Sequence, residues 1–304
     1  MILCCGEALI DMLPVQGPGG GIAYAPHAGG AVFNTAIALG RLGAPTGFFA
    51  GLAADFLGDI LRDTLAESKV DTRACVSAAR PSTLAFVKLV DGQATYAFYD
   101  ENTAGRMLTE ADLPEITEQA YFFGGISLVV EPCGATYEAL MGRARAAGKV
   151  TMLDPNIRPG FIKDEAAYRA RIDRMIGMAD IVKLSLEDLH WLARGEGEAF
   201  VRAMLSKGVS LVLLTDGGEG ATGITPTLRL TEPARKVSVV DTVGAGDTFN
   251  AGVLASLNAR DRLSRESLVR LDEDTLRAAL KLGAAAAAVT VSRAGANPPW
   301  PSEL

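Results

Sequence analysis

Short apolar runs alternate with amphipathic segments along most of the chain. The alternation is typical of βαβ units, in which each buried strand is followed by a helix that packs back onto the sheet. We therefore expect an α/β fold with three layers, where helices cover both faces of a mostly parallel sheet and ligands bind at the carboxyl ends of its strands. The runs ILCCGEALI, TGFFAGLA, AYFFGGISLV, VTMLD, DIVKLS and LVLLTD predict strands, and helices are predicted over about 33–42, 56–67, 135–147, 165–178, 187–193, 247–259 and 274–288.

Residues 82–99 interrupt this rhythm. Two alternating segments, 82–90 and 93–99, flank Asp91-Gly92, a pair typical of a two-residue hairpin turn. The glycine-rich stretch 17–21 and the residues after it predict one or two further strands. We expect insertions at about 12–28 and 82–106 to form a small antiparallel β lid. No linker divides the chain, so a single domain over 1–304 is predicted.

Composition excludes several classes of protein. The 29 basic residues are scattered and are outnumbered by 36 acidic ones, a net charge of −7, so we expect no nucleic-acid partner. The most apolar stretch, 282–291, has about half the length of a membrane span and predicts a buried helix that runs into a strand. Four cysteines without CxxC spacing and an N-terminus without a signal-like pattern predict free thiols in a cytoplasmic protein that does not bind membranes.

The most informative segment is DTVGAGDTFNAG, residues 241–252. Its glycines, Gly244 and Gly246, directly precede an amphipathic helix, and the free N–H groups at a helix N-terminus bind anions. Without a Cβ, these glycines let a phosphate approach the backbone closely. Asp247 adds a carboxylate, which can deprotonate a hydroxyl that attacks phosphorus. A glycine turn followed by a capping aspartate is the alternative interpretation.

This segment resembles the C-terminal signature of the ribokinase-like (PfkB) carbohydrate kinases. The segment GGAVFN, residues 29–34, is similar to the N-terminal signature of the same family, and the two motifs stand in the expected order. The resemblance covers essentially the whole chain. It implies a ribokinase-like fold, ATP as phosphoryl donor, Mg²⁺ as cofactor and a small-molecule sugar as acceptor. It places the catalytic base on Asp247 and the anion hole on the backbone of Gly244, Ala245 and Gly246.

The resemblance also assigns the sugar site. Asp11 is expected at the carboxyl end of the first strand, where a carboxylate can bind adjacent hydroxyls. Arg158, in DPNIRP, resembles the arginine of a DxNxR element and would supply positive charge near the transferred phosphoryl group or the far end of the substrate. A helix-capping turn is the alternative for this element. The assigned sugar-binding residues are Asp11, Gly29, Gly30, Asn34 and Arg158.

A nucleotide site follows from LVLLTDGGEGA, which resembles the strand and glycine turn beside ATP in the family. The formal GxGxxG at 218–223 is not a dinucleotide fingerprint, because a strand-like segment rather than a helix follows it. The resemblance also places small residues of a C-terminal helix beside adenine. The nucleotide-binding residues implied are Ser185, Thr215, Gly217, Gly218, Gly220, Gly283 and Ala287.

Two metal sites are implied by the same resemblance. The segment SLED departs from the family's NxxE element, because Ser185 replaces the asparagine and Asp188 holds the glutamate position beside Glu187. Either carboxylate could hold Mg²⁺ through water, and a solvated helix start is the alternative. Asp241, Thr242 and the loop that contains Gly295 match positions that bind a monovalent cation such as K⁺ in several family members.

The lid segment YAFYDENTAGRML, residues 96–108, is most like bacterial fructokinases. The 2-keto-3-deoxygluconate kinases usually carry a Tyr-x-Arg there to bind a carboxylate, which Tyr99-Asp100-Glu101 would repel. We therefore expect phosphorylation of a ketose at its primary hydroxyl, fructose to fructose 6-phosphate. A 2-keto-3-deoxygluconate kinase, another sugar or nucleoside kinase, a non-catalytic binding regulator and a nicotinamide oxidoreductase are the alternatives. The unpaired edges and apolar face of the lid predict a homodimer through the lid.

Overall fold

The computed structural model describes residues 1–90 and 93–304. Its largest element is an eight-stranded sheet in the order β14-β13-β12-β11-β10-β9-β1-β4. The strands from β4 to β12 in this order are parallel, and the hairpin β13–β14 adds an antiparallel edge, so the predicted mostly parallel sheet is confirmed. Its strands are β1 (Ile2–Cys5), β4 (Thr46–Phe49), β9 (Ala120–Gly124), β10 (Val150–Asp154), β11 (Ile181–Ser185), β12 (Leu211–Asp216), β13 (Gly220–Ile224) and β14 (Arg229–Glu232).

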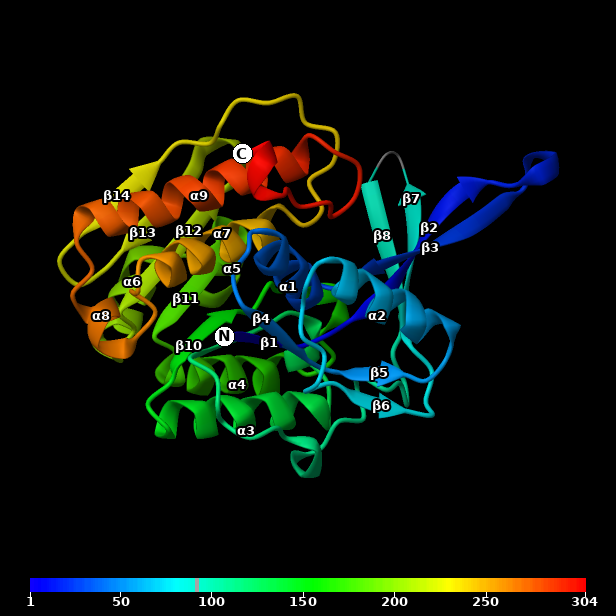
Figure 1. Cartoon of the computed structure of the whole chain (residues 1–304), viewed down its shortest axis with the longest axis horizontal. Helices are drawn as coiled ribbons and strands as arrows, with labels where there is room; N and C mark the ends of the chain where they lie inside the picture. Colours follow the sequence, from blue (N-terminus) through cyan, green and yellow to red (C-terminus); the bar gives the residue numbers. More distant parts are fainter. Residues whose placement is uncertain (91–92) are drawn as a thin grey trace.

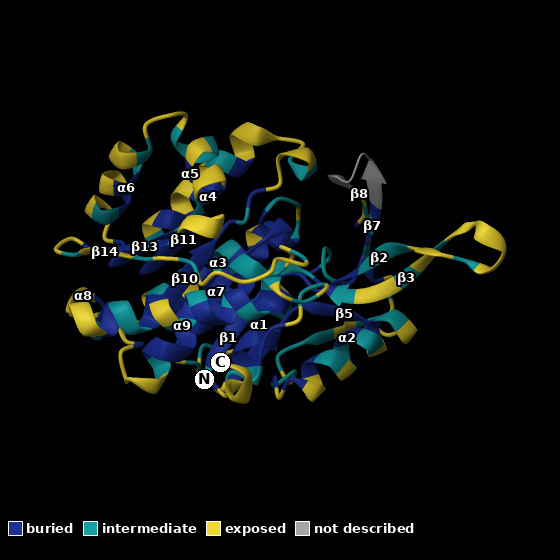
Figure 2. Cartoon of the chain, turned by 90° about the horizontal axis from the view of Figure 1, so that it is seen from above, coloured by how far each residue is buried: buried dark blue, intermediate teal, exposed yellow. Residues whose placement is uncertain are grey.

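Helices cover both faces of this sheet (Figure 1). Alternate side chains of β1 point to opposite faces: Ile2 and Cys4 belong to one buried core, Leu3 and Cys5 to the other. The buried layers are visible on both sides of the sheet in Figure 2. One face carries α1 (Ala31–Arg41), α2 (Phe56–Glu67), α7 (Ala245–Ala259), α8 (Arg265–Val269) and α9 (Glu273–Val291), and the other carries α3 (Cys133–Ala146), α4 (Glu165–Met178), α5 (Leu186–Ala193) and α6 (Gly197–Ser206).

Helices α7 and α9 cross at close range. A Cβ on Gly252 would lie 2.6 Å from the Cα of Gly283, so only glycine fits at this crossing. The prediction that 282–291 runs from a helix into a strand is wrong, because α9 continues to Val291. Small alanine side chains let this end of the helix pack closely, and that packing overrides its apolar, strand-like character.

A second, four-stranded sheet projects from one end of the molecule (Figure 1). Two antiparallel hairpins, β2–β3 and β7–β8, are joined through parallel pairing of β2 with β7. The predicted turn at Asp91-Gly92 lies outside the described residues. The strands are β2 (Leu9–Gln16), β3 (Ile22–Gly29), β7 (Thr83–Val90) and β8 (Gln93–Tyr99).

Three apolar runs that predicted single strands are divided in the structure. ILCCGEALI splits into β1 and β2, which belong to different sheets, so the prediction that Asp11 ends the first strand is wrong: it lies within β2. TGFFAGLA splits into β4 and β5 (Gly51–Ala53), which pairs with β6 (Val76–Ala78). AYFFGGISLV leaves the sheet at Gly125, where φ is +69°. The first and third breaks begin at glycines, Gly6 and Gly125, and the second falls at Ala50.

Cys4, Cys5, Cys75 and Cys133 are free thiols, as predicted. None of the helices in the described ranges is long and apolar enough to span a bilayer.

Candidate active site

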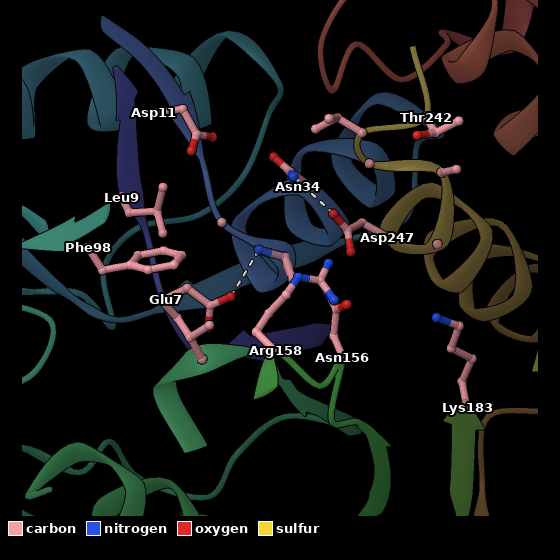
Figure 3. Close-up of a pocket in the computed structure, with 18 residues that line it drawn as sticks. Glu7, Leu9, Asp11, Asn34, Phe98, Asn156, Arg158, Lys183, Thr242 and Asp247 are labelled. Atoms are coloured by element: carbon pink, nitrogen blue, oxygen red, sulfur yellow. Dashed lines mark hydrogen bonds between the residues drawn. The ribbon is translucent and has the colours of Figure 1, made fainter. Parts of the chain in front are cut away.

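A cavity of about 310 Å³ lies where the strands of the large sheet end, between the sheet and the lid (Figure 3). It brings together the two sequence motifs, because Asn34 of α1 donates a hydrogen bond from Nδ2 to Oδ2 of Asp247 on α7 at 2.9 Å. Gly29 does not line the cavity itself but lies against Asp11, which does: a Cβ on Gly29 would lie 2.2 Å from the Asp11 carboxylate. Of the predicted catalytic and sugar-binding residues, the cavity is lined by Asp11, Gly30, Asn34, Arg158, Gly244, Ala245, Gly246 and Asp247.

The N-terminus of α7 opens into this cavity. Gly244 adopts a left-handed conformation with φ +77° just before the helix, and no side chain caps the helix. A Cβ on Gly244 would lie 2.7 Å from Ala296, so glycine is required for both conformation and space. The amide of Ala245 donates to the carbonyl of Thr242 at 3.4 Å, whereas the amides of Gly246 and Asp247 and the helix dipole remain available for an anion.

Asp247 is buried in the first turn of α7. Burial raises the pKa of its carboxyl to about 7, and Asp154 also raises it, whereas the hydrogen bond from Asn34 and the charges of Lys183 and Arg158 act in the opposite direction. A base whose pKa is close to neutral is well matched to proton transfer at physiological pH. Asp247 can therefore accept a proton from a hydroxyl bound in the cavity.

The opposite wall of the cavity comes from the lid. Asp11 projects from β2, and burial raises the pKa of its carboxyl to about 6. Phe98 of β8 lines the same wall. Arg158 lies on the loop after β10, where its guanidinium donates to the carbonyl of Ile157 at 3.1 Å. Carboxylate, guanidinium and aromatic side chains in one cavity of this size suit a polar ligand such as a monosaccharide.

Two buried charged residues at the site were not predicted from the sequence. The carboxylate of Glu7, between β1 and β2, accepts from the amide of Ala31 at 2.9 Å and from the amide of Ser127 at 3.3 Å. Lys183 of β11 donates from Nζ to Oδ2 of Asp154 at 3.0 Å. Glu7 is the only charged residue in the run ILCCGEALI, and Lys183 is the only charged residue in IVKLS, so each was a usable exception to the apolar pattern.

The predicted nucleotide-binding residues lie at the ends of neighbouring strands and on α9. Ser185 and Thr215 are paired in register at the ends of β11 and β12, and the glycine turn follows β12 directly. Gly220 and Gly283 also have packing reasons to be glycine: a Cβ would lie 2.2 Å from the Glu232 carbonyl in one case and 2.7 Å from the Phe249 ring in the other. Gly217 and Gly218 complete the turn, and Ala287 is half-buried on α9.

The predicted metal-binding carboxylates have different surroundings. Asp188 is buried, and its two oxygens accept from the amides of Ile157 and Ser185, whereas Glu187 is exposed. Asp241 joins two loops, because its carboxylate accepts from the amides of Val243 at 3.0 Å and Gly295 at 2.9 Å.

Within residues 1–90 and 93–304, no group of three or more His, Cys, Asp or Glu side chains could hold a metal by itself.

Comparison with known proteins shows the family of the chain. The family model of the pfkB family carbohydrate kinases matches residues 1–303. The chain belongs to this family. A curated fructokinase from Rhizobium leguminosarum bv. trifolii is 58% identical over 280 residues, which cover 91% of the chain and 86% of that relative. The fold class and the kinase family predicted from the two motifs are confirmed.

Solved structures of pfkB kinases share the whole fold. The crystal structure of a fructokinase with bound ATP from Xylella fastidiosa has a TM-score of 0.90 and 31% identity, and the match covers 97% of the chain and 93% of the other. A fructokinase from Vibrio cholerae O395, in a form with fructose, ADP and calcium ion bound, has a TM-score of 0.84 and 26% identity, covering 97% and 94%.

Proposed function

We propose that this pfkB kinase transfers the γ-phosphoryl group of ATP to the primary hydroxyl of fructose and so forms fructose 6-phosphate. The observation that carries the proposal is the buried Asp247 carboxylate, whose pKa is about 7, beside the uncapped N-terminus of α7 in a cavity large enough for a monosaccharide. The 58% identity to a fructokinase supports fructose as the acceptor.

In the proposed reaction the proton passes from the sugar hydroxyl to Asp247, and the phosphoryl group passes from ATP to the sugar oxygen. Asn34 holds Oδ2 of Asp247, which leaves Oδ1 to accept the hydroxyl proton as the sugar oxygen attacks the γ-phosphorus. The bond from that phosphorus to the β–γ bridging oxygen breaks, and ADP leaves. The amides at Gly244, Ala245 and Gly246 donate to the phosphoryl oxygens, where negative charge is concentrated.

The sugar is held between the two sheets. We assign its hydroxyls to Asp11 and Asn34, with Gly29 and Gly30 allowing the sugar to lie against the backbone. Arg158 supplies positive charge near the transferred group. Phe98 and the lid above it keep water from competing with the hydroxyl for the phosphoryl group.

ATP binds along the ends of β11 and β12 in this proposal, with Ser185, Thr215, Gly217, Gly218 and Gly220 near its phosphates and ribose, and Gly283 and Ala287 near its base. The donor set fits Mg²⁺ that is held mainly by phosphate and water oxygens, with Glu187 or Asp188 acting through water. When bound, Mg²⁺ neutralises phosphate charge.

Asp241 supports a monovalent cation site with Thr242 and Gly295, because its carboxylate already joins the two loops that would surround the ion. Faster turnover in K⁺ than in an equal concentration of a bulky organic cation tests this site.

We further propose that the chain acts as a single cytoplasmic domain, with the four-stranded sheet as its lid, and that two copies associate through their lids. Ile22, Tyr24 and Tyr99 are exposed on this sheet, Ile22 by 77%, and the rings of Tyr24 and Tyr99 both pack on Phe86. Apolar surface of this kind is unfavourable in water and is covered by a second copy. Light scattering is expected to give a dimer mass, and a concentration-independent monomer mass contradicts it.

A panel of acceptors tests the function directly. ADP release with MgATP is expected to be fastest, as kcat/KM, with fructose, compared with 2-keto-3-deoxygluconate, ribose and adenosine. Higher kcat/KM with one of the other three acceptors would reassign the substrate while leaving the kinase chemistry in place. Absence of acceptor-dependent ADP release with all four would overturn the proposal.

A further inference from the structure

Lys183 is a buried cation at the floor of the active-site cavity (Figure 3). It belongs to β11, whose other residues before Ser185 are apolar, and its side chain is 5% exposed. Its Nζ lies 3.0 Å from the position that a Cβ on Gly246 would occupy. The ammonium group therefore lies directly beside the backbone that forms the N-terminus of α7.

The hydrogen bonds of Lys183 leave part of its capacity unused. An ammonium group has three N–H donors, and within the described part of the chain Lys183 makes one hydrogen bond, to Asp154. The accepting atom, Oδ2 of Asp154, also accepts from Asn250 at 2.6 Å, so this carboxylate is fixed from two elements. A buried ammonium with unused donors costs free energy unless a ligand satisfies them.

Lys183 carries its charge at neutral pH. Burial lowers the pKa of the ammonium, but the carboxylates of Asp154, Asp188 and Asp247 outweigh this effect and leave the pKa above its ordinary value. A charged donor with unused N–H groups next to an anion-binding helix N-terminus is suited to a phosphoryl oxygen.

We propose that Lys183 is a further catalytic residue, which donates hydrogen bonds to the oxygens of the phosphoryl group during transfer, while Asp154 positions it. This inference rests on the proposed function. Negative charge in phosphoryl transfer is spread over the three equatorial oxygens, and a fixed cation beside them stabilises the transition state without reorganisation. Asp154 also accepts from the amide of Asn156 at 3.2 Å, which ties Lys183 to the loop that carries Arg158.

The same two residues act on the base in opposite directions. The charge of Lys183 lowers the pKa of Asp247 and the charge of Asp154 raises it; Arg158, on the loop after β10, and Asn34 on α1 also lower it. Loss of Lys183 alone therefore moves the acid limb of the pH profile to higher pH. Loss of both charges brings the limb back towards its native position.

The experiment compares Lys183→Met, which keeps the length of the side chain, with Lys183→Arg and the double variant Lys183→Met/Asp154→Asn. Lys207→Met is the matched control, because Lys207 is exposed, pairs with Asp173 and does not line the cavity. For Lys183→Met we expect kcat to fall by about 100-fold or more, with KM for fructose changed by less than about threefold. Lys183→Arg restores part of kcat, and Lys207→Met leaves it unchanged.

The double variant separates chemistry from folding. Lys183→Met leaves the Asp154 carboxylate buried without its partner, whereas the double variant removes both charges and avoids this penalty. We expect the double variant to fold, to keep the low kcat and to show an acid limb near that of the native enzyme.

A folded variant without Lys183 whose kcat lies within about threefold of the native value would overturn the inference. So would a low kcat with no shift of the acid limb and no recovery with arginine, which is the result of a purely structural role. Failure of the proposed function is a different result, since the native chain itself would then release no ADP with fructose.

Discussion

Two helix N-termini face the same cavity, and they serve different purposes. Both α1 and α7 begin after a glycine with positive φ, +112° at Gly30 and +77° at Gly244, and neither glycine provides a side-chain cap. At α1 the amide of Ala31 is occupied, because it donates to the Glu7 carboxylate at 2.9 Å. At α7 the nearby carboxylate, Asp247, is held by Asn34 instead of capping its own helix.

The difference teaches that a glycine-led helix N-terminus is not by itself a free anion site, because the fold can supply an internal carboxylate. GGAVFN and GAGDTFN look alike locally, yet a residue outside the first motif, Glu7, decides the outcome at α1. The α1 end is held by this internal contact, and the α7 end is the one that we propose binds the phosphoryl group. Substitutions at the N-termini of α1 and α7 test this difference in role.

The largest effect is expected at α7. Asp247→Asn keeps the shape of the side chain but removes the proton acceptor, so kcat is expected to fall by about 100-fold or more with little change in fructose affinity. Steady-state kinetics together with fructose binding by calorimetry check this. Turnover close to the native rate would show that Asp247 is not the base.

At α1 the expected effect is on stability. Glu7→Ala leaves the amides of Ala31 and Ser127 without their acceptor, at a cost of about 1–3 kcal/mol in the free energy of unfolding. Denaturant unfolding measures this cost. Unchanged stability would mean that Glu7 is not needed to cap α1.

Glu7→Gln adds a pH test of the same site. Burial raises the pKa of Glu7 in spite of the hydrogen bonds from Ser127 and Ala31. A raised pKa stabilises the fold at low pH, and this contribution is lost as pH rises through the folded pKa. The non-titrating glutamine variant is therefore expected to gain stability relative to the native chain as pH rises from the ordinary pKa of a glutamate through the raised pKa of Glu7 in the folded chain. A constant difference across that range would contradict the raised pKa.

The smallest effect is expected where the two helices meet. Asn34→Ala removes the hydrogen bond that lowers the pKa of Asp247, so the acid limb of kcat/KM moves to higher pH by less than about one unit. The pH dependence of fructose phosphorylation measures the shift. A limb that moves to lower pH would show that Asn34 does not stabilise the carboxylate.

Much of the body of the fold was predictable, because its signals are local. Buried parallel strands such as VTMLD and DIVKLS need apolar residues on both faces, and the helices between them need one apolar face. The divisions at Gly6, Ala50 and Gly125 were not predictable in the same way. A continuous apolar run has the same composition whether it stays in one sheet or passes between two.

The site was predictable where motif and chemistry coincide, and not where it depends on distant contacts. Asp247 and Asn34 lie in motifs, and the structure brings them together. The network of Asp154, Lys183 and Asn250 joins β10, β11 and α7, so no spacing along the chain reveals it. The one local sign of this network in the sequence is Lys183, a lysine in an otherwise apolar strand.

The short junction between β1 and β2 anchors the four-stranded sheet to the body of the molecule. Gly6, Glu7 and Ala8 are buried, and the carboxylate of Glu7 accepts hydrogen bonds from two other segments. These contacts fix the position of the four-stranded sheet where it joins the large sheet. At the far end, Gly19 and Gly20 have no neighbouring atoms within 4 Å of a Cβ position. The turn between β2 and β3 is therefore not constrained by packing at these two glycines, and lengthening it is expected to leave the residues that line the cavity in place.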